Sequence, residues 1–163
     1  MSTSDIKVRT GPASEPGIRH ADDLYGWVQQ QMTLLQTGEV HKVDTSELLQ
    51  ELAEMGRGEF AKLVSAIRLV LHHFLKWDYQ PERRSRSWTV SIRQQRRKIA
   101  DELLDSPSLK PRILDAVQRA YLRAVDDASK ETGLPASAFP SECPYSWDDI
   151  TLRPIDWDDD QSR

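Results

Sequence analysis

The stretch at residues 59–77, EFAKLVSAIRLVLHHFLKW, is the most apolar part of the chain and decides the fold class. Its apolar side chains recur every three to four residues on one broad face, a pattern typical of a helix at the centre of a bundle. Lys62, Arg68, His72 and His73 are among the polar residues that interrupt it. The stretch is therefore too short and too polar to span a bilayer, and it predicts a buried central helix.

Four more amphipathic stretches flank this helix. Apolar residues at helical spacing occur in residues 22–37 (Leu24, Trp27, Val28, Met32, Leu34, Leu35), in 44–55 (Leu48, Leu49, Leu52, Met55), after Ser85 or Ser87 (Trp88, Ile92, Ile99, Leu103), and from Ser108 to Thr132 (Ile113, Leu114, Val117, Ala120, Tyr121, Ala124, Val125, Ala128). Gly56 and Gly58 predict that the second stretch weakens or kinks before residue 59. Aromatic residues between prolines after Gly133 predict short turns that dock against the helices.

No stretch alternates between apolar and polar residues as a strand does, and the chain has no internal repeat. We therefore predict an all-α fold, with about five principal helices in a single bundle-like domain and a short-turn C-terminal segment. We expect a flexible N-terminal segment at residues 1–19, the helical domain at 20–157, and a frayed acidic tail at 158–163.

Composition narrows the classes of function. The 163 residues carry 22 basic and 26 acidic side chains, a net charge of −4, so the chain as a whole is not a basic nucleic-acid coat. A single cysteine excludes a disulfide framework and a cysteine-rich zinc module. The N-terminal residues lack the apolar core of a signal peptide, so we expect a cytoplasmic protein with no membrane association.

Residues 73–96, HFLKWDYQPERRSRSWTVSIRQQR, form a long and chemically unusual block. Four flanking motifs accompany it: DLYGW at 23–27, ELAEMG at 51–56, DSPSL at 105–109 and FPSECP at 139–144. Block and flanks together resemble an uncharacterised bacterial family, domain of unknown function 29, over about residues 21–157. The resemblance implies a small, cytoplasmic, helical protein with no assigned activity and no catalytic residue to carry over.

The same block contains the candidate binding surface. Residues 82–98 hold seven basic side chains against one acid, Glu82, and aromatic residues lie beside them. Arginine and aromatic side chains together are typical of interaction hot spots. We therefore predict a small interaction or accessory protein that binds an unidentified protein, or a second copy of itself as a homodimer, through residues 76–97. The binding residues that we predict are Trp77, Tyr79, Arg83, Arg84, Arg86 and Trp88.

Two other uses of these residues stay open. Arginines suit phosphate groups and aromatic rings stack on bases, so nucleic-acid binding through the basic helix 82–98 is the first alternative. In the opposite interpretation, the tryptophans close the end of the bundle and the arginines pair with carboxylates, among them those of the acidic C-terminal segment. The sequence does not decide whether that segment covers the basic helix.

A metal-dependent activity is the second alternative. Glu51 and His73 become candidate metal ligands if the two helices predicted to carry them pack together. Their spacing matches no metal motif, and the chain contains none of the common nucleophile or phosphate-binding motifs. We therefore predict no catalytic residue and no cofactor, and we favour a binding protein over an enzyme.

Overall fold

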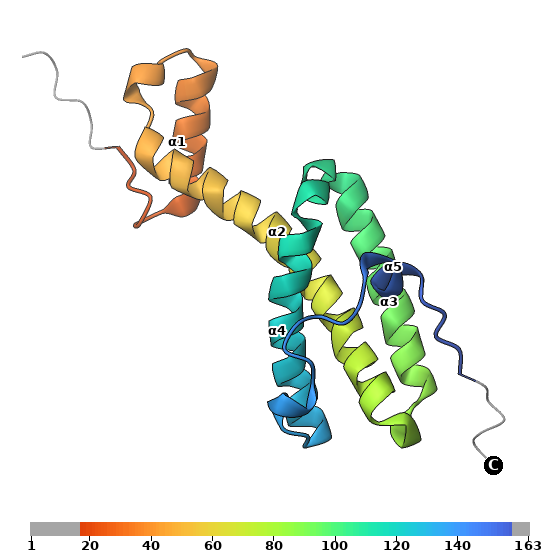
Figure 1. Cartoon of the computed structure of the whole chain (residues 1–163). Helices are drawn as coiled ribbons and strands as arrows, with labels where there is room; N and C mark the ends of the chain where they lie inside the picture. Colours follow the sequence, from red (N-terminus) through yellow and green to blue (C-terminus); the bar gives the residue numbers. More distant parts are fainter. Residues whose placement is uncertain (1–16, 158–163) are drawn as a thin grey trace, which may run out of the picture. The chain divides into compact units, whose positions relative to one another are not determined.

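The computed structural model describes residues 17–157 (Figure 1). Its secondary structure within these residues is helical. The five α-helices are α1 (Leu24–Gln36), α2 (Thr45–Tyr79), α3 (Arg86–Asp105), α4 (Ile113–Thr132) and α5 (Trp147–Leu152). Short 3-10 helices lie between them: η1 (Val40–Lys42), η2 (Pro81–Arg83), η3 (Pro107–Arg112) and η4 (Ala136–Ala138). No strand occurs among the described residues, so the predicted all-α fold is confirmed. Of the two predicted flexible ends, residues 1–16 and 158–163 lie outside the described part.

Helix α2 corrects one prediction, because it runs without a break through Gly56 and Gly58. A glycine in a helix interior costs about 1 kcal/mol relative to alanine, but it keeps its N–H and removes no hydrogen bond. Good helix formers on both sides outweigh that cost. The two helices expected there are therefore one helix of 35 residues.

The sequence predicted one domain over residues 20–157, and these residues form two compact units that meet within α2, between Ala53 and Glu54. The described part of the first unit, residues 17–53, is a hairpin of α1 and the first turns of α2. Asp23 caps α1 by accepting a hydrogen bond from the Gly26 amide. Trp27 is the one apolar side chain buried in this part of the chain.

The second unit, from residue 54 onward, contains the main core. The remainder of α2, α3 and α4 run up and down beside one another, joined by short turns (Figure 1). The buried residues of α2 span Phe60 to Trp77, which confirms the predicted central helix. Gly133 ends α4 in the left-handed conformation, with φ of 74°. Leu114 was predicted to face inward, yet it is 70% exposed, because it lies in the first turn of α4 at the edge of the buried arc.

The C-terminal segment docks on this bundle, as its proline-separated aromatic residues predict. The Tyr121 hydroxyl donates a hydrogen bond to the Pro140 carbonyl oxygen at 2.7 Å. Phe139, Ile150 and Ile155 are buried and complete the core. None of the described helices is long and apolar enough to cross a membrane.

Candidate functional site

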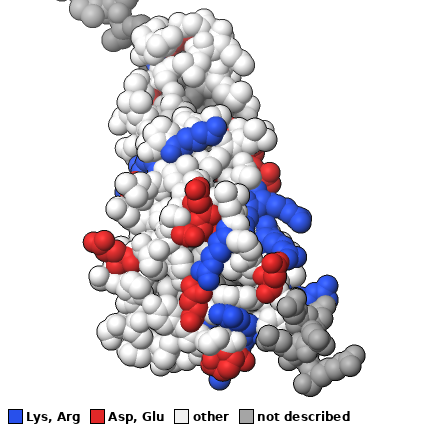
Figure 2. All heavy atoms as spheres, turned by 45° about the vertical axis from the view of Figure 1, so that its right-hand side comes forward, with Lys and Arg blue, Asp and Glu red and all other residues white. Residues whose placement is uncertain are grey.

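The solvent-facing side of α3 carries a row of cations. Arg86, Arg93 and Arg97 follow one another at intervals of seven and four residues, which places them on one helical face within about 17 Å. All three are exposed, and Val90 lies between them with 41% of its surface exposed. Exposed Lys98 flanks the row. We call these five residues the α3 basic face; Figure 2, which turns the α3 side of the bundle forward, shows Lys and Arg side chains gathered there beside acidic ones.

Few acids balance this face. Within residues 17–157, the one acidic side chain within 4.0 Å of its cations is Asp156, whose Oδ1 lies 3.7 Å from Arg93 Nη2. Both side chains are more than half exposed, so the pair contributes little to stability. The predicted cover by the acidic tail 158–163 lies outside the described residues. In the described part of the chain, the α3 basic face is thus an exposed cationic surface.

Both tryptophans of the predicted binding surface belong to the packing of the bundle. Trp77 is only 7% exposed, and the Arg84 guanidinium lies 4.8 Å from its ring centre. Arg84 also donates a hydrogen bond to the Trp77 carbonyl oxygen at 2.9 Å. Trp88 is half-buried against the core, with Lys76 Nζ 4.3 Å from its ring centre. Because cations already occupy these ring faces, the tryptophans offer no open platform for a nucleic-acid base.

The remaining three predicted binding residues, Tyr79, Arg83 and Arg86, have different environments. Tyr79 is 37% exposed, and its ring centre lies 5.0 Å from that of Phe139. Arg83 is exposed at the end of η2 and has no acidic partner among the described residues. Arg86 belongs to the α3 basic face. The six predicted residues therefore form no single exposed patch: Arg83 and Arg86 are open to a partner, whereas Trp77, Arg84 and Trp88 serve the fold.

Arg96 shows why the charge run in the sequence overstates the exposed charge. Although it lies in the middle of the basic stretch, it points toward α5. Its Nε and Nη2 donate hydrogen bonds to the carbonyl oxygens of Ile150 at 2.8 Å and Asp149 at 2.9 Å. Burial lowers the pKa of the Arg96 guanidinium. This side chain therefore fastens the C-terminal segment to α3, a role that charge counting alone cannot reveal.

A carboxylate on α2 fastens the same segment from the other side. Asp78 accepts two hydrogen bonds from Arg153, at 2.7 and 2.9 Å, and one from the Tyr145 hydroxyl at 2.8 Å. Burial by itself would raise the pKa of Asp78, but the hydrogen bonds from Arg153 and Tyr145 hold it below its ordinary value. The sequence separates Asp78 from Arg153 by 75 residues, so no local pattern could have paired them.

A second polar network joins α2 to α4. His72 Nε2 lies 2.5 Å and Lys76 Nζ 2.9 Å from the same oxygen of Glu131. Burial would raise the pKa of Glu131, but its hydrogen bonds and charge interactions with Lys76 and His72 more than compensate and lower it. Burial lowers the pKa of His72. The network neutralises the ammonium of Lys76, which is only 6% exposed, where it enters the core.

His73, one of the two candidate metal ligands, lies beside this network. Its ring centre is 6.5 Å from that of Trp88, and its Nδ1 is buried without a hydrogen-bond partner. Burial, reinforced by the neighbouring His72 and Lys76, lowers the pKa of His73 to about 4. No group of three or more His, Cys, Asp or Glu residues within residues 17–157 is arranged to hold a metal ion.

Glu51, the other candidate, has a partner of its own in the first unit. His20 Nε2 lies 2.7 Å from Glu51 Oε1, and His20 Nδ1 lies 3.7 Å from Glu47 Oε2. The pattern of the sequence did not single out His20, because no periodic signal marks a residue that precedes its helix. The premise of two packed helices is also wrong, because Glu51 and His73 both lie on one helix, α2.

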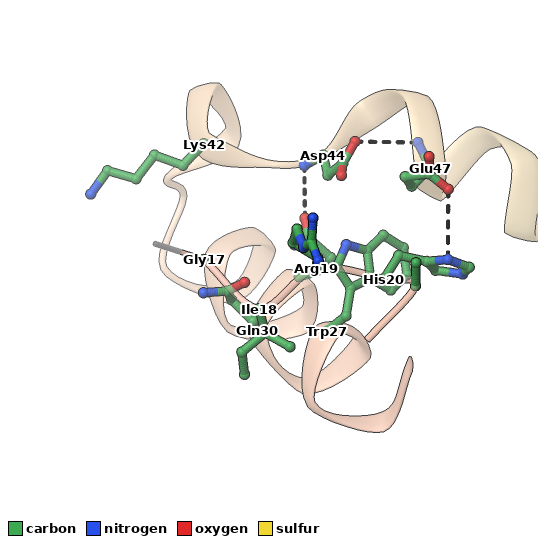
Figure 3. A pocket seen from close by; sticks show the side chains of 11 residues that line it. Gly17, Ile18, Arg19, His20, Trp27, Gln30, Lys42, Asp44 and Glu47 are labelled. Atoms are coloured by element: carbon green, nitrogen blue, oxygen red, sulfur yellow. Dashed lines mark hydrogen bonds and ion pairs between the residues drawn. The ribbon is translucent and has the colours of Figure 1, made fainter. Parts of the chain in front are cut away.

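His20 borders a cleft of about 520 Å³ in the first unit (Figure 3). Its ring meets Trp27 edge-on, with ring centres 4.9 Å apart. The buried Trp27 Nε1 has no hydrogen-bond partner. Gln31 also lines the cleft, and its side-chain oxygen accepts a hydrogen bond from the Asp44 amide at 2.8 Å. The cleft is polar, but most of its charged groups already pair within the hairpin.

An arginine cluster around Phe60 is a further feature that the sequence reasoning missed. The Arg112 and Arg119 guanidinium carbons lie 3.7 and 5.4 Å from the Phe60 ring centre. Both arginines also pair with Asp115, each at 2.7 Å. The cluster covers the Phe60 ring, and the single carboxylate of Asp115 neutralises one of its two positive charges.

Comparison with known proteins identifies a family for this chain but assigns it no activity. No curated protein and no solved structure matches the chain. One family, described as "Domain of unknown function DUF29", matches residues 20–154, which include the α3 basic face and both polar networks. The match confirms the resemblance inferred from the central block. The chain therefore belongs to the family described as Domain of unknown function DUF29.

Proposed function

We propose that this protein is an interaction module whose α3 basic face docks on an acidic, partly apolar segment of another protein. The observation that carries the proposal is the exposed row of Arg86, Arg93 and Arg97, which has only one weak acidic partner among the described residues. Like charges in a row repel one another in the free protein, and this repulsion is relieved when an anionic partner binds.

A protein partner suits this face better than a nucleic acid does. Val90 lies among the arginines with 41% of its surface exposed, and exposed Leu104 continues the same helical face. Arginine mixed with apolar side chains is the composition of protein interfaces. Single-stranded nucleic acid, in contrast, needs aromatic platforms, and Trp77 and Trp88 are already engaged in the bundle.

A charge-reversal experiment tests the proposal. In the first variant, Arg86→Glu, Arg93→Glu and Arg97→Glu are combined. A matched control combines Lys110→Glu, Arg123→Glu and Lys130→Glu, which change the charge equally at exposed cations elsewhere in the same unit. Far-UV circular dichroism and thermal unfolding first establish that both variants retain the wild-type helical content and stability.

Each protein is then immobilised and used to capture proteins from bacterial lysate. In a separate assay, a glutamate-rich peptide and a single-stranded oligonucleotide are each titrated against the wild type and both variants at two salt concentrations. We expect the captured proteins and the peptide to bind wild type and control but not the variant of the α3 basic face. Oligonucleotide binding that is lost in the same variant and falls steeply with salt would instead establish the nucleic-acid alternative. Equal binding by both variants would refute a role for this face.

We also propose that the protein acts in the cytoplasm. Its one cysteine, Cys143, is half-buried and unpaired, and burial raises the pKa of its thiol, which keeps the group in its unreactive form. A protein without disulfides suits a reducing compartment.

A further inference from the structure

The hairpin of the first unit buries very little apolar surface. Within residues 17–53, only Trp27 and Gln31 are buried, and one of these is polar. Small units with little buried apolar surface often gain stability by association. The single cysteine gives the chain no disulfide, so the apolar side chains that this hairpin leaves exposed are the place to look for a contact that stabilises it.

Helix α1 exposes a row of large apolar side chains. Leu24, Met32 and Leu35 are 51%, 47% and 47% exposed. At about 100° per residue they lie within an arc of about 80° on the helix. Trp27 and Gln31 lie beside this arc on the side that faces α2, since Gln31 bonds the Asp44 amide. The exposed row is therefore separate from the surface that α1 uses inside the hairpin.

The first turns of α2 expose a matching row. Leu49 and Leu52 are 62% and 55% exposed, whereas Glu47 and Glu51 on the other flank turn toward His20. In an antiparallel helix pair, two rows displaced in the same rotational sense from the contact line lie on the same side of the pair. The two rows together are the exposed apolar residues Leu24, Met32, Leu35, Leu49 and Leu52, which we call the hairpin face.

The hairpin face is also nearly free of charge. The sequence of α1, LYGWVQQQMTLLQ, contains no acidic or basic residue. Surface helices normally carry charges, and charge depletion is a property of the centres of interfaces.

We infer that the hairpin face is a homodimer interface, in which two copies pack their hairpins into a four-helix arrangement about a two-fold axis. A two-fold interface brings each patch against itself, so any charge on the axis would meet its own copy. An uncharged face avoids that repulsion, whereas binding to a different protein gains from complementary charges. Self-association is therefore the use that the composition of α1 favours.

The area of the hairpin face determines how tightly the two copies should bind. Helix α1 is about 20 Å long, and two adjacent helices are about 20 Å wide, so each copy offers a footprint of roughly 400 Å². This is below the roughly 800 Å² of accessible surface per partner in interfaces of standard size. We therefore expect a dimer that dissociates in the micromolar range and not a permanent one.

Sedimentation velocity of the full chain, from about 1 to about 200 µM, tests the inference. The wild type should shift from monomer to dimer over this range. The double variant Met32→Lys, Leu52→Lys should raise the dissociation constant at least tenfold, because it places like charges in both rows. The matched control Leu114→Lys, Leu122→Lys changes leucines of the second unit that are 70% and 66% exposed, and it should dimerise as the wild type does.

Two outcomes would overturn the inference. A wild type that stays monomeric at every concentration would show that another part of the chain or a different protein covers the face. A dimer that weakens equally in both double variants would place the interface elsewhere. The wild-type measurement needs no substitution, so it decides the matter even if the hairpin variant unfolds. The charge-reversed variant of the α3 basic face should still dimerise, which separates this inference from the proposed function.

Discussion

Alanine substitutions at three glycines test the continuity of α2 most directly. Gly56 and Gly58 lie inside the helix, and Gly133 ends α4 with φ of 74°. A methyl group built at any of the three would meet no atom within 4 Å. Packing is thus the same in each case, and the backbone conformation alone determines the sign of the effect.

The expected magnitudes follow from that conformation. In a helix interior, alanine is more stable than glycine by about 0.5 to 1 kcal/mol, so Gly56→Ala and Gly58→Ala should each raise the free energy of unfolding by that amount. The two introduced methyl groups point to different faces of α2, so their effects should add, and the double variant should gain about 1 to 2 kcal/mol. Gly133→Ala should lose about 1 to 2 kcal/mol, because an L-residue is strained in the left-handed region.

Urea unfolding followed by circular dichroism measures these differences, and each kcal/mol corresponds to about 2–4 °C in Tm for a chain of this size. Amide hydrogen exchange at residues 54–60 reports on the local helix even if the two units unfold separately. A loss of stability in both Gly56→Ala and Gly58→Ala, similar to that of Gly133→Ala, would refute the uninterrupted helix through residues 56–58.

The buried ionisable groups make two further predictions. The folded protein holds the pKa of Asp78 below its unfolded value, so this carboxylate stabilises the fold above about pH 4 and the contribution is lost as the pH falls through the lowered pKa. Asp78→Asn should therefore lower the free energy of unfolding by about 1–3 kcal/mol at pH 7 and by progressively less as the pH falls below about 4, as measured in urea. A loss that does not change with pH would contradict the ion pair with Arg153. His73 should remain neutral down to about pH 4 in the folded state, whereas the unfolded chain takes up a proton near pH 6.5. The free energy of unfolding should therefore fall as the pH is lowered from about 6.5 to about 4. NMR titration of the ring protons measures this pKa directly, and a midpoint near 6.5 would show that the ring is solvated.

Most of the fold could be predicted because it depends on local patterns. The apolar stretch 59–77 has the pattern of a helix at the centre of a bundle, and Gly133 marks a helix end through its own backbone preference. The split of α2 into two helices at Gly56 and Gly58 was mispredicted because glycine weakens a helix without removing a hydrogen bond. Whether it interrupts the helix depends on the flanking residues, and here they continue it.

The candidate site was predicted less well, because exposure is not a local property. Arg84, Arg86 and Arg96 look alike in the sequence, yet one stacks on Trp77, one faces solvent and one bonds α5. Leu24 and Met32 have the spacing of a buried face, yet both are about half exposed. A helical period shows which residues share a side of the helix, but not whether anything packs on that side.

The sequence by itself determined the all-α class, the central helix, most helix ends and the family, since each of these depends on neighbouring residues or on a continuous motif. Only the tertiary structure decided which cations are free, which carboxylates hold the C-terminal segment, and that α1 leaves an uncharged apolar face exposed. These features depend on contacts between residues up to 75 positions apart, such as that of Asp78 with Arg153. Their energies come from burial and pairing in the folded chain, and no stretch of sequence records them alone.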